Sequence, residues 1–262
     1  QANEAFRTAT SEADVNPLYK VRWAMLLHER FNDKDAEDLL NEALKADPND
    51  AEAYLGLAQV SSDGFDGKAM ESVGKAIALD PKLVEAHELA ADLLLEDAKQ
   101  DEAVKEADTA IALSPYAGGS DALDAMAIRA TVDLLADKNA DAEGWFAKIK
   151  AVNPGYGEGY AIAAKHLVLN RRYQDGVAYY RKAIAADPEL WSARSELGIN
   201  LMRLGEEDEP EKQLEVCYEN GYRDAATVNS LRLLDSYKNF VTYKDATTIL
   251  RLNKNEADLW KP

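Results

Sequence analysis

The sequence predicts an all-α fold, a solenoid of paired antiparallel helices with a short β-hairpin near its C-terminal end. Three observations indicate it. A proline-terminated segment recurs at a nearly constant spacing, each repeat contains two amphipathic helical patterns, and small residues recur at equivalent places. Because each unit of such an array buries its faces against its neighbours, we expect a series of linked cores along the chain.

The repeat is clearest at the segments that close each unit, which read EALKADP, KAIALDP, TAIALSP, KIKAVNP and KAIAADP. Proline ends a helix because its ring removes a backbone N–H and biases the preceding residue away from the αR region. The residues that come next, such as Asn49 and Asp50, are suited to capping the following helix. The prolines lie 33, 34, 39 and 34 residues apart, at Pro48, Pro81, Pro115, Pro154 and Pro188.

Small side chains recur when each repeat is numbered so that its proline falls at place 32. Small residues at places 20 and 27 let neighbouring helices approach closely, and bulkier residues at place 24 fill the space between units. Place 20 holds Ala36, Ala69, Ala103, Ala142 and Gly176, place 27 holds Ala43, Ala76, Ala110, Ile149 and Ala183, and place 24 holds Leu40, Val73, Phe146 and Tyr180.

The repeats follow one another from the N-terminus. In residues 1–16, Ala2, Phe6 and Ala9 fit the second helix of a truncated preceding repeat, so we expect the native chain to extend further in that direction. Six units come next, at 17–50, 51–83, 84–117, 123–156, 157–190 and 191–224.

Two stretches depart from the regular pattern. Residues 118–122 (GGSDA) are surplus between the third and fourth units and predict a local bend or a lengthened helix. The sixth unit is degenerate, because Pro210 stands at place 20 and Tyr222 stands where the closing proline belongs. It keeps Leu197 and Gly198 at places 7 and 8.

The pattern changes after the sixth unit. Residues 225–239 read as a capping helix that shields the last repeat from water. The β-branched and aromatic stretch that follows predicts a hairpin at 240–244 and 247–252. Because an isolated hairpin is marginal in water, it has to pack on something. The remainder of 240–262 begins another helix with Asn255 as its cap, the possible start of a following domain.

Period, small places and terminal prolines together resemble the tetratricopeptide repeat (TPR) family over nearly the whole chain. The resemblance implies a right-handed superhelix that acts as a non-catalytic protein–protein interaction scaffold. In this family the first helices line a concave groove. Their groove-facing places here hold Arg22, Met25, Glu52, Leu55, Gln59, Glu85, Glu88, Asp92, Asp124, Ile128, Glu158, Lys165, Ser195, Ile199 and Arg203.

The middle of this groove is acidic, which sets the expected partner. Family members that bind acidic C-terminal tails use Lys and Asn at places 5 and 9, which here hold Val21 and Met25 in the first complete unit. We therefore expect a basic or mixed peptide segment, steered by Glu85, Glu88 and Asp92. The alternative is that these carboxylates only keep the solenoid soluble. A self-assembly module is a third possibility, and the sequence leaves the oligomeric state open.

Residues 223–262 resemble the junction at which a bacterial TPR array leads into a gluzincin-type (peptidase MA-like) metallopeptidase domain. This resemblance implies an alternative function, an arm that positions substrate or partners for a zinc peptidase whose catalytic domain lies beyond residue 262. It assigns no catalytic residue to this chain.

Charge and hydropathy restrict the partner classes. The chain has 48 acidic and 30 basic residues, a net charge of -18, which disfavours nucleic acid and anionic membrane surfaces. No apolar run of about 18 residues predicts membrane insertion. No signal peptide is visible, so periplasmic, secreted and cytoplasmic locations all stay open.

Motifs for catalysis, metals and cofactors are missing from the sequence. An HExxH zinc motif fails twice, because His28-Glu29 is followed by Asn32 and His87-Glu88 by Ala91, and His166 stands alone. GYGEGY (155–160) is not a dinucleotide fingerprint, and GxSxG is absent. Cys217, the only cysteine, is expected to be a small buried residue. The sequence therefore predicts no enzyme activity, no metal and no cofactor.

Overall fold

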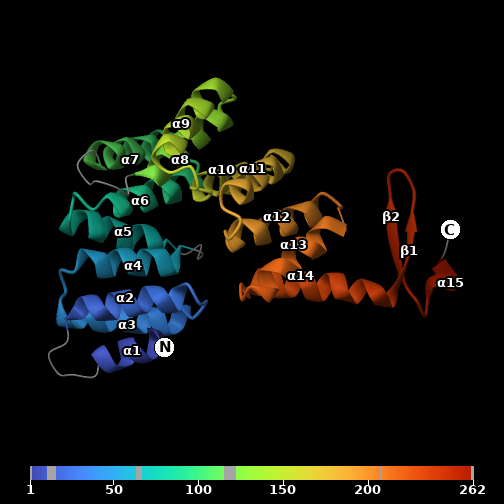
Figure 1. Ribbon diagram of the computed structural model, residues 1–262, viewed down its shortest axis with the longest axis horizontal. Helices are drawn as coiled ribbons and strands as arrows, with labels where there is room; N and C mark the ends of the chain where they lie inside the picture. Colours follow the sequence, from blue (N-terminus) through green and yellow to red (C-terminus); the bar gives the residue numbers. More distant parts are fainter. Residues whose placement is uncertain (1, 11–15, 63–66, 115–121, 207, 261–262) are drawn as a thin grey trace.

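The computed structural model describes residues 2–10, 16–62, 67–114, 122–206 and 208–260. It is an all-α solenoid of antiparallel helix pairs with one two-stranded antiparallel hairpin, which confirms the predicted fold class (Figure 1). In the described part of the chain, no helix has the length and apolar character needed to cross a membrane.

The helices of the array alternate between first and second members of each pair. Their bounds are α1 Ala2–Ala9, α2 Pro17–His28, α3 Asp33–Ala46, α4 Ala51–Ser61, α5 Lys68–Leu79, α6 Val84–Glu96, α7 Gln100–Leu113, α8 Leu123–Leu135, α9 Asn139–Val152, α10 Glu158–Leu169, α11 Tyr173–Ala186, α12 Trp191–Arg203, α13 Asp208–Glu219 and α14 Ala225–Ser236. Each even-numbered helix from α2 to α12 is the first member of its unit, and α1 packs on α2.

In four units, the residue before the closing proline ends its helix by the same local contact. Asp47, Asp80, Asn153 and Asp187 leave the helix in extended conformation, and each side chain accepts a hydrogen bond from the backbone N–H two residues later. Asp and Asn favour such local bonds to the backbone, which is why they stop helices here. Asp50 then caps α4 by accepting from the Ala53 N–H, as predicted.

The core runs along the array as linked clusters between adjacent units. The small residues of places 20 and 27 are buried, with Ala36, Ala43 and Ala76 showing no exposed surface, and Leu40 and Val73 of place 24 are fully buried beside them. Second helices therefore contact the next unit's first helix closely, as packing of small against bulky side chains requires.

The course of the chain turns back on itself. In Figure 1, α2–α6 are stacked on one side, α7–α9 lie at the top, and α10–α14 return on the other side. We call α2–α6 the first arm and α10–α14 the second arm. At the turn, α10 packs on α8 and also contacts α6, two units earlier. The surplus residues 118–121 lie outside the described residues, and Ala122 adopts a left-handed conformation with φ 54° just before α8.

The C-terminal tail forms a small unit of its own. A 3-10 turn, Tyr237–Asn239, takes the last residues of the expected capping helix, and the hairpin follows as β1 Phe240–Lys244 and β2 Ile249–Asn253. The second strand begins two residues later than expected, because the Asp245 side chain accepts from the Thr247 and Thr248 N–H groups and keeps them in the turn. The hairpin packs on the 3-10 turn and on α15, Ala257–Trp260.

The candidate binding groove

Two predicted groove residues, Glu88 and Asp92, lie where the first helices contact one another, a surface that we call the inner wall. Both belong to α6, and their partners belong to α8 and α10, the first helices of the next two units. The first helices of units three, four and five therefore meet through side chains that face one another.

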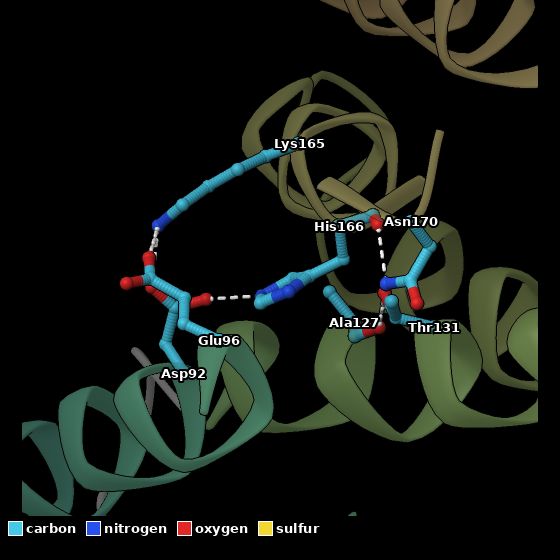
Figure 2. Close-up of polar contacts among 7 residues, drawn as sticks. All are labelled: Asp92, Glu96, Ala127, Thr131, Lys165, His166 and Asn170. Atoms are coloured by element: carbon cyan, nitrogen blue, oxygen red, sulfur yellow. Dashed lines mark hydrogen bonds and ion pairs between the residues drawn. The ribbon is translucent and has the colours of Figure 1, made fainter. Parts of the chain in front are cut away.

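Asp92 is the centre of an ion-pair cluster that joins α6 to α10 (Figure 2). Its Oδ2 atom lies 2.8 Å from Lys165 Nζ, and its Oδ1 atom lies 2.6 Å from His166 Nε2. Lys165 also pairs with Glu96, one turn further along α6. His166 is fully buried, so its hydrogen bond to Asp92 is made inside the protein. The cluster connects units three and five directly.

Titration of Asp92 reflects these contacts. Burial alone raises the pKa of this carboxyl group, but the hydrogen bond from His166 and the charge of Lys165 outweigh it and hold the pKa below its ordinary value. Burial lowers the pKa of Lys165, but the charges of Asp92 and Glu96 more than compensate and raise it. Asp92 is therefore ionised, and its charge is already neutralised within the protein.

A second group of carboxylates, next along the wall, has a different character. Glu88 Oε1 accepts from the Ala125 N–H at 3.1 Å and so caps α8 from the neighbouring unit. Asp124 accepts a hydrogen bond from the Tyr156 hydroxyl, and Glu158 begins α10 nearby. We call Glu88, Asp124 and Glu158 the carboxylate row. Among the described residues, no lysine or arginine forms an ion pair with any of the three.

The carboxylate row holds its protons more tightly than ordinary carboxyl groups. Burial and the charges of Asp124 and Glu85 raise the pKa of Glu88 to about 8, against the opposing bond from Ala125. Burial and the charges of Asp124 and Asp187 raise the pKa of Glu158 to about 7. Burial likewise raises the pKa of Asp124. These shifts arise because burial disfavours the ionised form and neighbouring carboxylates add negative charge, while no lysine or arginine in the described part of the chain pairs with the row.

A cavity of about 630 Å³ opens beside the row, between the two arms. It combines an apolar floor with charged side chains of both signs, which is the composition of many ligand-binding clefts. Its lining comprises Ser62, Glu96, Glu158, Ala161, Ile162, Lys165, Val168, Leu169, Tyr180, Ser192, Ala193, Glu196 and Arg203.

Three of the predicted contact residues are buried between helices and are not available to a partner. Leu55 is 8% exposed and Ile128 is fully buried, so both pack in the core. Ser195 is also buried, and its hydroxyl bonds to Thr227 of α14 at 2.6 Å. Each of these side chains points toward the helix that follows in the row of first helices, and that helix covers it. The structure thus corrects their assignment as partner contacts.

The other predicted residues keep some exposed surface, but they are spread along the wall. Arg22 pairs with Glu52 at 3.5 Å in the first arm, far along the array from the cavity. Glu158, Lys165 and Arg203 line the cavity together. Partly or largely exposed at other points of the wall are Met25, Gln59, Glu85 and Ile199.

Sequence reasoning missed the roles of Tyr156, His166 and Tyr180. Tyr156 lies in a turn between units and Tyr180 on a second helix, so neither occupies a groove-facing place, yet one bonds to the carboxylate row and the other lines the cavity. His166 directly follows the groove-facing Lys165, and only the spatial approach of α10 to α6 reveals its partner. The clearest available signal was the adjacent pair Lys165-His166 in an acidic protein.

The described residues give no metal centre, since no three His, Cys, Asp or Glu side chains are arranged to hold one. Cys217 is buried, as predicted, and burial raises the pKa of its thiol to about 11. Such a thiol is mostly protonated at neutral pH and unsuited to nucleophilic chemistry.

Comparisons with known proteins agree with this geometry. A family model described as tetratricopeptide repeat matches residues 18–60. No curated protein shows a significant match in sequence.

Solved structures extend the likeness over most of the chain. A thermophilic TPR protein of Thermus thermophilus is 20% identical with a TM-score of 0.54, covering 71% of this chain and 99% of that one. A tetratricopeptide repeat protein of Parabacteroides merdae is 14% identical with a TM-score of 0.57, covering 89% and 90%. The type IV pilus biogenesis factor PilW is 18% identical with a TM-score of 0.53, covering 84% and 100%. The fold of this chain is that of a tetratricopeptide-repeat solenoid.

Proposed function

We propose that this protein is a non-catalytic protein–protein interaction scaffold whose inner groove binds a basic or mixed peptide segment. The observation that supports it is the carboxylate row, three crowded acidic groups with raised pKa values and no ion-pair cation among the described residues. A lysine or arginine from a partner would relieve this crowding. The same site repels an acidic peptide, so charge favours one class of partner over the other.

Contacts within the protein guide which acidic residues we assign to the partner. Asp92 already pairs with Lys165 and His166, so its charge is neutralised within the protein. Glu85 is exposed near the row and adds to its potential. We therefore assign the steering of a basic segment to Glu85, and the close contact with its lysine or arginine to Glu88 and Glu158, which lose their protons as the cation binds. Apolar contacts come from the cavity floor, for example Ile162 and Leu169.

The test is a peptide array followed by fluorescence anisotropy with the peptides that bind. We expect peptides with lysine or arginine to bind, and the double variant E88Q/E158Q to bind them roughly tenfold more weakly, because close charge pairs at an interface contribute on this scale. The control E37Q/D38N replaces the same number of carboxyl groups at exposed positions of α3 and should bind like the wild type. An array that favours acidic peptides would contradict the proposal. Equal affinity of E88Q/E158Q and wild type would show that the carboxylates only maintain solubility.

A second candidate function is the positioning arm of a zinc metallopeptidase. The observation that favours it is the tail, in which a hairpin and α15 follow the capping helix and leave Leu259 and Trp260 78% and 68% exposed. Exposed apolar side chains of this size suit contact with a further domain. Reading the coding sequence past residue 262 tests this directly: an HExxH motif on a predicted helix supports the arm, and an open reading frame without one removes it.

A further inference from the structure

Besides the Asp92 cluster, which joins α6 to α10, the two arms of the solenoid meet at an aromatic pair. Phe31 lies in the turn between α2 and α3, and Tyr222 lies in the turn between α13 and α14. Their ring centroids are 5.1 Å apart and their planes are at 89°. This edge-to-face geometry is the favourable one for aromatic rings, because it sets the positive edge of one ring against the negative face of the other. The pair joins the first unit to the sixth.

The turn that contains Phe31 does not require an aromatic side chain at this position. Its φ is +61°, in the left-handed region that bulky residues rarely adopt. The equivalent turn positions of other units share this conformation and hold Ala98, Asp137, Arg171 and Gly205. Phe31 is also 43% exposed, so it is no core residue of its own unit. Its contact with Tyr222 is the structural feature that sets it apart.

The cavity depends on the distance between the same two arms. Ser62 and Glu96, at the ends of α4 and α6, line it from the first arm. Ser192, Glu196 and Arg203 on α12 line it from the second arm. A contact between the arms at Phe31 and Tyr222 therefore limits how far the cavity opens.

We propose that Phe31 and Tyr222 form a clasp that closes the solenoid into a ring, and that opening of this clasp admits a partner segment to the cavity. A single aromatic pair is weak enough to open and close rapidly, and it changes the balance of closed and open forms by roughly fivefold. The clasp follows from the geometry of the arms and does not depend on the charge of the partner.

Distance measurements between spin labels test the closure. Labels are placed at E37C on α3 and E215C on α13, both exposed positions, in a C217A background that removes the buried native cysteine. We expect one short, narrow distance distribution, and a longer, broader one in F31G and in Y222A. Glycine suits the left-handed turn, so F31G retains its fold.

Matched variants separate the clasp from a general loss of aromatic surface. F31Y keeps both rings and should behave like the wild type. Y19A removes an exposed tyrosine from α2, outside the contact, and should also leave the distances unchanged. An F31G distribution identical to that of the wild type, or a wild type already as broad as F31G, would overturn the proposal.

Access to the cavity is measured without a partner. S192C, within the cavity, is reacted with a polymer-linked maleimide in the C217A background, and E102C on α7 serves as an exposed reference site. We expect S192C to react roughly fivefold faster in F31G and Y222A, in line with the weight of one aromatic pair. The reaction at E102C should stay constant. Equal S192C rates in all variants would show that the contact does not control access.

Discussion

At the scale of single residues, Glu88 and Asp92 show how the same side chain type titrates in opposite directions on one helix. They are four residues apart on α6, and both are largely enclosed by α8 and α10. Asp92 has Lys165 and His166 as partners, and its pKa falls. Glu88 has backbone N–H donors but also Asp124 and Glu85 nearby, and its pKa rises to about 8. The presence of a cation within contact distance decides the sign.

Glu88 should make the protein less stable as the pH rises. Its pKa is raised in the folded state from 4.5 to about 8, so the folded state binds more protons between these values. Stability is therefore full below about pH 4.5 and is lost as the pH rises through 8. In urea unfolding, we expect the unfolding free energy of the wild type to fall between pH 5 and pH 9. In E88Q this fall should be smaller by on the order of 2 kcal/mol. An unchanged slope would refute the assignment.

Asp92 should act in the reverse sense. Its folded pKa lies below the ordinary 3.8, so its contribution is present above that value and is lost as the pH falls through the folded pKa. D92N leaves Lys165 with Glu96 as its only charged partner and gives His166 a neutral amide oxygen in place of a carboxylate. We expect a loss of about 2–4 kcal/mol in unfolding free energy at pH 7, as when one partner of a buried pair is removed. D38N, at an exposed position of α3, is the control and should change little. A loss in D92N as small as in D38N would show that the cluster does not stabilise the fold.

At the scale of elements, glycines report how closely helices approach. A Cβ atom at Gly157 would lie 2.6 Å from the Ala183 carbonyl oxygen, a backbone atom of α11 that cannot move aside cheaply. At Gly74 in α5 and Gly144 in α9, a Cβ atom meets nothing within 4 Å. The first glycine is therefore needed for packing, and the other two weaken their helices.

Alanine substitutions should divide accordingly. We expect G74A and G144A each to raise the unfolding free energy by about 0.5–1 kcal/mol, because alanine restricts the unfolded chain and favours the helix. G157A should lower it by about 1–3 kcal/mol through the clash with α11. Thermal or urea unfolding of the three single variants decides this, and stabilisation by G157A would contradict the close approach.

Sequence patterns predicted the helices well because each one is specified locally. The Asp-Pro and Asn-Pro steps end helices through hydrogen bonds that span two residues. The small residues at places 20 and 27 lie on the same helix as the bulkier residue at place 24. The start of β2 was predicted two residues too early, because the Asp245 turn depends on where one carboxylate finds its donors. Local rules of this kind reach only a few residues.

The candidate groove was less predictable, because its chemistry depends on angles between units. Place numbering put Glu88, Asp92 and Lys165 among the groove residues, but it gave no sign that Lys165 would neutralise Asp92 across two units. Nor did it show that the next first helix would cover Ile128 and Ser195. The rotation of each unit against the next fixes these contacts, and no single repeat contains that information.

At the scale of the whole molecule, net charge and curvature act together. A chain with a net charge of -18 repels itself, and bringing two acidic arms near each other adds to this cost. The Asp92 cluster offsets part of it, because it places Lys165 between α6 and α10 at the point where the chain turns. Salt screens repulsion between the exposed charges more than it weakens the largely enclosed cluster.

The contact between Phe31 and Tyr222 also changes how such an array comes apart. In a linear solenoid the end units open first, and each unit exchanges its amide hydrogens at a rate set by its own local opening. Here the first and sixth units contact each other, so local opening of one exposes part of the other. The two openings are therefore coupled, by about the free energy of one aromatic pair.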